Sequence, residues 1–572
     1  MSYLDSPRIH FSGQFQADPS TVNNTPANFD TRTFGPNSDP SWNPNGSGAF
    51  RLLSCTVRRV VYSDGTWCED PAADPIVGAI VTQADNRVTA KIVDLDSEQQ
   101  MVSEIWGLQV RLVSPSGQEY WRASFEIAAF TDLWLRAVGG GGGDAPMAAV
   151  YQSRLTGVRW TGAGNSRLLR ELNQTSPRSF SIKFNVDGFS LDSTSPQFTV
   201  GRAVGSIGPY FDGEPDRFVA GRLLRPTTAN NTYPLGNIPP VYFIPGKVAT
   251  AGTSVTIDLG NALPTDGAGG PIHDTGKLRL AILPPHNEAP EHIGEITGYT
   301  SPNWYTNTAG VVTLPLTRGQ NKRASSTPLA LLQDADPSPN GSGQGLPYII
   351  LAAENQSGGF LRADQYVFRM SPGDRAQARL LALRFGRPAA NERIYLGLNA
   401  GLVNSKQNPF NPNSLPLGVP ESALRVPPVI TTAADGWAEA TLTAGDPGNP
   451  RGYIDGQVYG VAYTWEPAMW PGYNVDPWNF LSVLVWNQFD PPAVPRWADV
   501  EPILRQYKNL YPIMGRIVDL SNLASVQRNL DALRMAFSLP VDDPNSMPVT
   551  RDLSPAKRRM LLAWLNAPEL LV

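Results

Sequence analysis

Cysteine, histidine and charge are all scarce in this chain. Its 572 residues include two cysteines and four histidines, and only 17% of them are charged, with a net charge of −5. Two cysteines cannot provide a disulfide framework. Because no long run of lysine and arginine occurs, the electrostatic footprint of a nucleic-acid-binding protein is absent as well. We therefore expect no nucleic-acid partner.

Long apolar runs are also missing. No stretch approaches about eighteen uninterrupted apolar residues, the length a membrane helix needs, and the first residues lack the basic and then apolar pattern of a secretion signal. The sequence predicts no membrane span and a cytoplasmic location.

The two cysteines, Cys55 and Cys68, flank Asp64-Gly65, a dipeptide that favours a tight hairpin. A two-residue turn there puts Cys68 opposite Val61 and leaves Cys55 several residues further along the strand. A disulfide needs the two α-carbons within about 7 Å. The sequence therefore predicts two buried thiols.

Glycine and proline are abundant, with 52 and 53 residues. This composition favours many short strands joined by turns, so we expect a mainly β chain of several sandwich-like or barrel-like domains followed by a small C-terminal helical segment. The length suggests roughly three or four domains. The expected divisions are a first β domain with an irregular N-terminal arm (1–235), a second β domain (236–426), an Ig-like β segment (427–490) and the helical segment (491–572).

The helical segment is predicted from apolar residues that recur every three or four positions. They form two series, Val500, Ile503, Tyr507, Leu510 and Met514, and then Leu523, Val526, Leu530, Leu533 and Phe537. Ser521 and Ser554 are expected N-caps, the latter with Pro555 at the first helical position. We expect three packed helices.

Four short motifs resemble one known family. They are Pro7-Arg8-Ile9-His10-Phe11-Ser12-Gly13, Gly221-Arg222-Leu223-Leu224-Arg225-Pro226, Asn307 to Leu316, and Leu553 to Leu565. The chain resembles the N-terminal, strand-rich half of the family of iminophenylpyruvate dimer synthase and chromopyrrolate synthase, which act in the violacein, rebeccamycin and staurosporine pathways. The ferritin-like, iron-binding C-terminal half of that family has no counterpart in this sequence.

The resemblance implies a lineage without its iron chemistry. In the family, iron is held by carboxylates and histidines on a helical bundle, with a Glu-x-x-His signature. This chain contains no Glu-x-x-His, and none of its four histidines falls on an expected helix. We predict no cofactor, with haem or a divalent metal as the alternative.

Two places could hold such a metal. His286, Glu288 and His292, together with Glu291 and Glu295, offer nitrogen and oxygen ligands within ten residues, although three prolines exclude a helix there. The alternative is a polar loop between strands. His10, within the first family-like motif, is either a haem or metal ligand or a hydrogen-bonded structural histidine.

Three further groups are candidates for binding or chemistry. Trp465, Trp470, Tyr473 and Trp478 lie in the densest aromatic region and either stack on an aromatic ligand or pack in the core. Asp94 and Asp96 are a carboxylate pair for which capping or solvent exposure is favoured over acid–base catalysis. Lys557, Arg558 and Arg559 occupy the first turn of the last helix, where the helix dipole disfavours cations. They either dock an acidic partner or lay their stems over apolar surface.

Together these observations favour a non-catalytic β-rich protein that binds a protein partner, a second copy of itself or an aromatic small molecule. One alternative is an enzyme of tryptophan-derived specialised metabolism, with its site in a pocket between β domains. Another is a lectin-like or toxin-component protein that binds surfaces.

Overall fold

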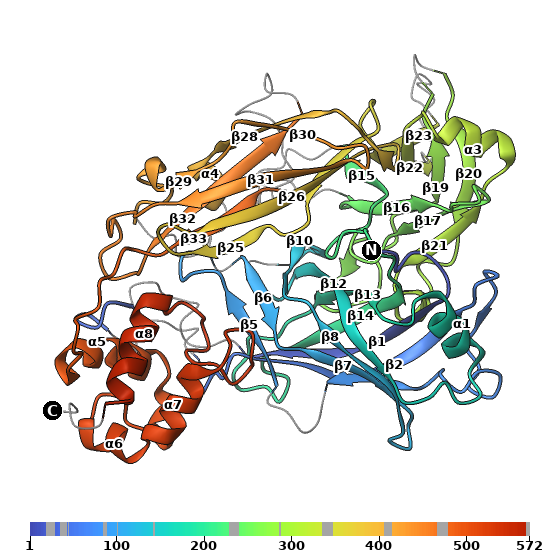
Figure 1. The fold of residues 1–572 in the computed structure, drawn as a ribbon. Coiled ribbons are helices and arrows are strands. Elements are labelled where there is room, and N and C mark those ends of the chain that lie inside the picture. The colour runs from blue at the N-terminus through green and yellow to red at the C-terminus, as the bar shows by residue number, and fades with distance from the viewer. Residues whose placement is uncertain are drawn as a thin grey trace.

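The computed structural model describes residues 1–18, 29–34, 43, 45–83, 89–99, 101–140, 143–227, 240–284, 288–334, 347–404, 415–465 and 479–567. Three β assemblies follow one another along the chain, and a helical segment comes last (Figure 1). The prediction of a mainly β chain with a small C-terminal helical segment is confirmed.

The first assembly is a 13-stranded sheet, eight strands of which close into a barrel. The closed path runs β1-β14-β13-β12-β8-β7-β4-β2 and returns to β1, and every neighbouring pair is antiparallel. The barrel strands are β1 (Arg8–Ala17), β2 (Ala49–Val61), β4 (Ile80–Gln83), β7 (Gln109–Val113), β8 (Glu119–Phe125), β12 (Met147–Trp160), β13 (Phe180–Asp187) and β14 (Val200–Pro209).

The remaining five strands extend the barrel sheet. They are β3 (Trp67–Cys68), β5 (Ala90–Asp94), β6 (Ser103–Trp106), β9 (Ala128–Ala129) and β10 (Thr131–Leu135). β5, β6 and β9 continue the sheet beyond β2, so β9 forms its free edge. The helix α1 (Arg167–Thr175) packs Leu168, Leu169 and Leu172 against the barrel core.

The barrel interior is filled by aromatic side chains. An eight-stranded barrel leaves just enough room for side chains, and here rings from β2, β12 and β13 meet in the middle: Tyr151 lies 5.4 Å from Phe184 and 6.0 Å from Phe50. Gly13, the last residue of the first family-like motif, lies where β1 crosses β2 closely. A Cβ at Gly13 would come within 2.5 Å of the Cys55 backbone, so the barrel needs glycine there.

The second assembly is an eight-stranded sheet in the order β20-β19-β22-β23-β15-β16-β17-β21. Its strands are β15 (Arg222–Pro226), β16 (Ile244–Val248), β17 (Ser254–Asp258), β19 (Leu278–Ile282), β20 (Glu291–Ile296), β21 (Val311–Pro315), β22 (Leu329–Asp334) and β23 (Tyr348–Ala353). A small parallel pair, β11 (Ala137–Val138) with β18 (Thr265–Asp266), connects it to the barrel chain. Two short helices, α2 (Trp304–Thr308) and α3 (Arg318–Ala324), complete this part.

The third assembly is a sandwich of two five-stranded sheets that share one core. One sheet contains β24 (Gly359–Ala363), β26 (Arg375–Arg384), β27 (Arg387–Pro388), β29 (Leu424–Arg425) and β31 (Trp437–Ala444). The other contains β25 (Val367–Met370), β28 (Arg393–Leu398), β30 (Val429–Thr431), β32 (Gln457–Thr464) and β33 (Leu481–Val485). The helix α4 (Ala400–Asn404) follows β28. The division expected at residues 426/427 runs through this sandwich, because β26 pairs with β31 and β28 with β32.

The C-terminal segment holds α5 (Trp497–Leu510), α6 (Leu523–Arg528), α7 (Leu530–Ser538) and α8 (Pro555–Leu565). The second predicted helix is split at Asn529, whose side-chain amide donates to the Ser525 carbonyl and so competes with the backbone. Its N-cap is Asn522 and not Ser521 as predicted, since the Asn522 side chain accepts from the Ser525 N–H at 3.0 Å. Ser554 caps α8, with Pro555 in its first turn, as predicted.

In the described parts of the chain, no helix combines the length and apolar character that a membrane crossing requires.

Both cysteines are free thiols. Cys68 lies opposite Val60 and not Val61, since the turn is longer than two residues, and Cys55 pairs with Val81 across β2 and β4. Cys55 is buried, and burial raises its pKa to about 12. Cys68 is only partly buried, which differs from the predicted pair of buried thiols.

Candidate functional site

The barrel meets the second assembly along a polar stripe of β13. Phe180, Ile182 and Phe184 point into the barrel core, so the alternate residues point outward. These are Ser181, Lys183, Asn185 and Asp187, and all four are buried, with at most 4% of their surface exposed. We call this contact, made by β13 with residues 258–263, the closed seam.

Charges in the closed seam are paired. Lys183 Nζ lies 2.8 Å from Asp258 Oδ2, and the Tyr3 hydroxyl donates to the same oxygen at 2.7 Å. Arg136 donates to Asp187 at 2.7 Å and to the Leu263 carbonyl at 2.8 Å. Burial lowers the pKa of Lys183.

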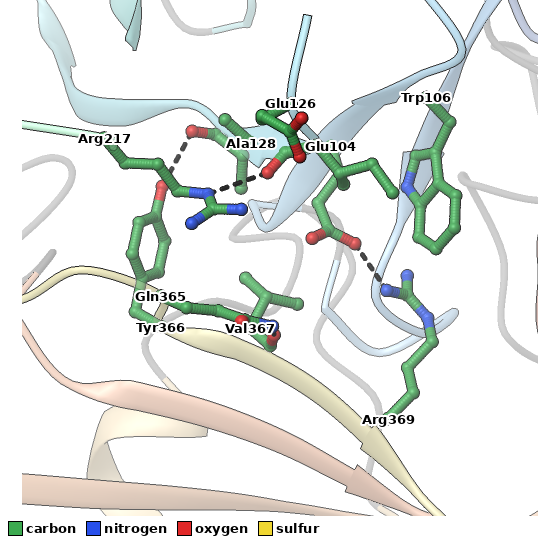
Figure 2. A pocket seen from close by; sticks show the side chains of 11 residues that line it. Glu104, Trp106, Glu126, Ala128, Arg217, Gln365, Tyr366, Val367 and Arg369 are labelled. Carbon is green, nitrogen blue, oxygen red and sulfur yellow. Dashed lines mark hydrogen bonds and ion pairs between the residues drawn. The ribbon is translucent and has the colours of Figure 1, made fainter. Parts of the chain in front are cut away.

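The barrel meets the sandwich differently, around a pocket of about 210 Å³. Its walls come from the free edge of the barrel sheet, from residue 217, and from β25, which is the edge strand of its own sheet (Figure 2). The lining residues are Glu104, Trp106, Glu126, Ile127, Ala128, Ala129, Arg217, Gln365, Tyr366, Val367 and Arg369. We call this contact the open junction.

Side chains cover the exposed carbonyls of both strand edges. The Tyr366 hydroxyl donates to the carbonyls of Ala129 and Phe130 at 2.7 and 3.1 Å. Arg217 Nε donates to the Ile127 carbonyl at 2.8 Å, and Gln365 donates to the Val367 carbonyl at 2.9 Å. Burial raises the pKa of Tyr366 well above its ordinary value, so it remains a neutral donor. These contacts protect edges that would otherwise pair with another strand.

One cation of the open junction is fixed by its neighbours. Arg369 forms an ion pair with Glu104 and donates to the Asp94 carbonyl at 3.1 Å, and its guanidinium lies 5.1 Å from the Trp106 ring. Less than a tenth of either charged side chain is exposed. This pair holds β6 against β25.

The other cation is not fixed in this way. Arg217 uses only Nε, and its two terminal nitrogens have no partner among the described residues; Figure 2 shows them turned into the pocket. On the same lining, Glu126 accepts from the Thr156 hydroxyl through Oε1 at 2.7 Å, and none of the described residues donates to Oε2. No ion pair joins Arg217 to Glu126, although both residues are within the described chain. Burial raises the pKa of Asp364, and the nearby Arg217 charge opposes that rise, so Arg217 has a carboxylate in its vicinity without an ion pair between the two side chains in the described residues. The open junction therefore holds a cation and a carboxylate, Arg217 and Glu126, that do not contact each other and whose hydrogen-bonding groups are only partly used.

The predicted carboxylate pair, for which capping or solvent exposure was expected, lies beside this junction, and both carboxylates are buried. Burial raises the pKa of Asp94 to about 8, and its side chain accepts from the Ser103 hydroxyl. Asp96 accepts from the Glu98 N–H at 2.8 Å, which is a capping contact, and forms a two-pronged ion pair with Arg451 at 2.8 Å. Asp94 thus links β5 to β6 within the barrel sheet, and Asp96 ties that sheet to Arg451 of the sandwich chain.

The predicted metal ligands are not gathered into a site in the described part of the chain. His286 lies outside the described residues. Glu288 is exposed, His292 is exposed on β20, and Glu291 pairs with Arg323. Among the described residues, no three His, Cys, Asp or Glu side chains lie close enough together to hold a metal ion.

His10 is a buried, hydrogen-bonded histidine. Its Nδ1 lies 2.7 Å from the Ser206 hydroxyl, and Arg8 Nε lies 3.3 Å from its Nε2. Burial, followed by the charges of Arg8, Arg59 and Lys183, lowers its pKa well below the ordinary value. These contacts match the structural alternative and occupy both ring nitrogens.

Of the predicted aromatic site, only Trp465 lies within the described residues. It is partly buried against the sandwich core, and the Arg384 guanidinium lies 4.7 Å from its ring. Trp470, Tyr473 and Trp478 lie outside the described residues.

The predicted docking residues are largely bonded within the chain. Lys557 Nζ lies 2.9 Å from Asp455, and Arg558 donates to the carbonyls of Phe537 and Met547 at 3.0 and 2.9 Å. Arg559 alone of the three is exposed. These internal partners explain why basic residues are tolerated at a helix N-terminus, where the dipole disfavours them.

Arg217, Glu126, Glu104 and Arg369 were not candidates from the sequence. They lie on segments far apart in the chain, at 104–129, 217 and 365–369, and no short motif or periodicity relates them. The available signal was only that Arg217 lies in the irregular loop between β14 and β15.

Comparison with known proteins leaves the chain without an assigned family. No family model matches, and no curated protein matches. Among solved structures, a two-domain protein of unknown function from Bacteroides fragilis overlaps 23% of this chain and 46% of its own, with 12% identity and a TM-score of 0.17. The D0-D1 domain of intimin overlaps 41% of this chain and 90% of its own, with 13% identity and a TM-score of 0.15. An S-layer protein, rSbsC, overlaps 78% of this chain and 54% of its own, with 10% identity and a TM-score of 0.15. The chain thus spans less than half of the first of these structures, and at such TM-scores function must be argued from its own residues.

Proposed function

We propose that this protein is a non-catalytic, β-rich binding protein and that the open junction holds its ligand. One observation carries the proposal: charged side chains from three distant segments converge on a pocket in which the terminal nitrogens of Arg217 have no partner among the described residues. A guanidinium presents its donors as a planar fork suited to a carboxylate or phosphate. A half-buried cation with a free fork is therefore suited to binding.

The size and position of the pocket support a small molecule as the ligand. A volume of about 210 Å³ is below the usual range for drug-sized ligands, roughly 300–1,000 Å³, and suits a compact metabolite. Pockets at domain interfaces are common binding sites. A protein partner or self-association remains a separate hypothesis; its predicted residues Lys557 and Arg558 already have partners within the chain.

The lineage is proposed on the sequence motifs alone. The chain is related, on this proposal, to the N-terminal half of the dimer-synthase family. In the structure the first motif lies mostly on β1 and the second mostly on β15. In β15, Arg222 forms an ion pair with Glu354 and donates to the carbonyls of Ala324 and Thr327, so this motif residue has a structural role.

The rival function is an enzyme of tryptophan-derived metabolism. One observation favours it: the pocket lies between two β assemblies, where that hypothesis requires an active site. Binding of the ligand without chemical conversion favours the binding protein, and conversion of the ligand favours the enzyme.

The test is equilibrium dialysis of the full chain against a metabolite extract, followed by mass spectrometry of what the protein retains. Gln365 is exposed at the pocket, so Gln365→Trp fills the site with little cost to the fold. Gln377→Trp, at an exposed position of the same sandwich, is the matched control. We expect wild type and Gln377→Trp to retain the same metabolite and Gln365→Trp to lose it. Equal retention by all three proteins contradicts the proposed site, and chemical conversion of the retained metabolite favours the enzyme.

A further inference from the structure

The two unused charges of the open junction determine what kind of ligand it accepts. Arg217 offers two terminal N–H donor groups, and Glu126 offers Oε2 as an acceptor. If the two side chains touched, they would neutralise each other and the pocket would have no charge preference. Their separation leaves a positive and a negative position on one lining.

The ion pair of Glu104 with Arg369, on the same pocket, provides an internal comparison. Glu104 and Arg369 contact each other directly, and both side chains are more than nine-tenths buried. That pair has no charge left for a ligand, apart from Arg369 Nε, which is buried without a partner. Arg217 and Glu126 are half-buried, so solvent and small molecules can reach them.

The remaining walls are apolar or aromatic. Ala128, Ala129 and Val367 contribute small apolar groups, and the rings of Trp106 and Tyr366 close two sides (Figure 2). The guanidinium groups of Arg369 and Arg551 lie 5.1 and 5.8 Å from the Trp106 ring centroid. The lining therefore offers one ligand two opposite charges together with small apolar groups.

We infer that the open junction binds a small zwitterion of the α-amino acid class, with its carboxylate on the Arg217 fork, its ammonium group on Glu126, and its apolar side chain against Ala128, Ala129 and Val367. This inference rests on the proposed function and adds the ligand class. Both contacts are charge-assisted hydrogen bonds, the stronger kind. A ligand that lacks either charge leaves one protein charge without its partner.

The experiment compares three molecules of similar shape by isothermal titration calorimetry on the full chain. L-Leucine carries both charges, 4-methylpentanoate lacks the ammonium group, and 3-methylbutylamine lacks the carboxylate. Glycine and L-phenylalanine test the size of the apolar end. We expect an amino acid to bind, and each leucine analogue to bind at least about tenfold more weakly than L-leucine, since one charged hydrogen bond is lost.

Matched variants test which charged group of the ligand each of the two residues binds. Glu126→Gln keeps the size of the side chain and the acceptor for Thr156, so it should fold normally and weaken L-leucine about tenfold without weakening 4-methylpentanoate. Arg217→Met should abolish binding of both. Glu439→Gln and Arg178→Met change exposed residues elsewhere and should leave binding unchanged.

Each other outcome contradicts the inference. If 4-methylpentanoate binds wild type as tightly as L-leucine, the site takes a simple carboxylate, and the proposed binding function survives without the zwitterion. If no amino acid binds wild type, the ligand class is wrong, and the dialysis experiment with Gln365→Trp still decides the proposed function. If L-leucine binds Arg217→Met normally, the amino acid lies elsewhere.

Discussion

The barrel contacts its two β neighbours in different ways. Toward the second assembly it presents Lys183 and Asp187, whose charges are paired in a seam with almost no exposure. Toward the sandwich it presents Glu104 and Glu126 around a pocket of about 210 Å³. Ion pairs compensate the buried charges of the closed seam, although Arg136 Nη2 and the Asn185 side-chain amide are buried there without a hydrogen-bond partner. The closed seam therefore fixes one neighbour in place. The open junction keeps two charges half-used, and this difference is why we assign binding to it.

The largest expected effect is in the closed seam. Lys183→Met removes the cation and leaves Asp258 charged and buried, which should destabilise the protein by about 3–5 kcal/mol. Chemical denaturation followed by tryptophan fluorescence measures the shift. Arg178→Met, which breaks an exposed pair with Asp212, should leave the midpoint unchanged. Equal midpoint shifts for the two variants would show that the Lys183–Asp258 pair of the closed seam contributes no more to stability than an exposed pair.

The next effect concerns pH at the edge of the open junction. Burial raises the pKa of Asp94 to about 8, whereas an unfolded aspartate has a pKa of about 3.9. Between these values the folded protein holds a proton that the unfolded chain releases. The contribution of Asp94 to stability therefore falls as pH rises through this window, by ~1.4 kcal/mol per unit at most.

Asp94→Asn isolates this contribution. Relative to Asp94→Asn, wild type should lose about 2 kcal/mol between pH 6 and 7.5, as measured by denaturation at each pH. Asp531→Asn, on a side chain that is 98% exposed, is the control and should track wild type. A wild-type curve parallel to that of Asp94→Asn would mean that Asp94 is ionised in the folded protein.

A smaller effect separates the residues of the basic turn. Arg558→Glu loses donors to the carbonyls of Phe537 and Met547 and should destabilise the helical segment by about 1.5 kcal/mol. Arg559→Glu alters an exposed side chain at a helix N-terminus and should be neutral or slightly favourable. Thermal unfolding by circular dichroism compares the two. Equal changes in stability for the two variants would mean that Arg558 and Arg559 act alike, as the prediction of one docking surface from the sequence implies.

The smallest expected effect is the change in stability caused by the pocket substitution Arg217→Met. Arg217→Met gives up one hydrogen bond to Ile127 and the charge interaction with Asp364 but also removes a half-buried charge, so its free energy of unfolding should stay within about 1 kcal/mol of wild type. A large loss of stability would mean that Arg217 is a structural residue, as Arg369 is.

The sequence predicted features that depend on neighbours in the chain. Composition indicated many short strands, helical spacing indicated α5, and the Ser554 cap with Pro555 indicated α8. The interruption at Asn529 was missed because its cause is one side-chain hydrogen bond and not a change of period. Closure of the barrel depends on β1 pairing with both β2 and β14.

The open junction could not be predicted from the sequence, because it too depends on contacts between residues far apart in the chain. Its charges meet only after the edge of the barrel sheet and β25 come together, and the chain between residues 129 and 365 first forms the last strands of the barrel sheet and the whole second assembly. The sequence did place a possible site between β domains. Which residues form it depended on long-range packing that no local pattern records.

Hydrogen exchange followed by mass spectrometry tests the central claim most directly, because it reads both junctions in one experiment. In the free protein, peptides covering 104–129 and 365–369 should exchange faster than peptides covering 181–187 and 258–263, since the closed seam is buried and paired. Adding the metabolite retained in dialysis should slow exchange at the open junction and leave the closed seam unchanged. Protection that appears at the closed seam, or at neither place, would contradict the account.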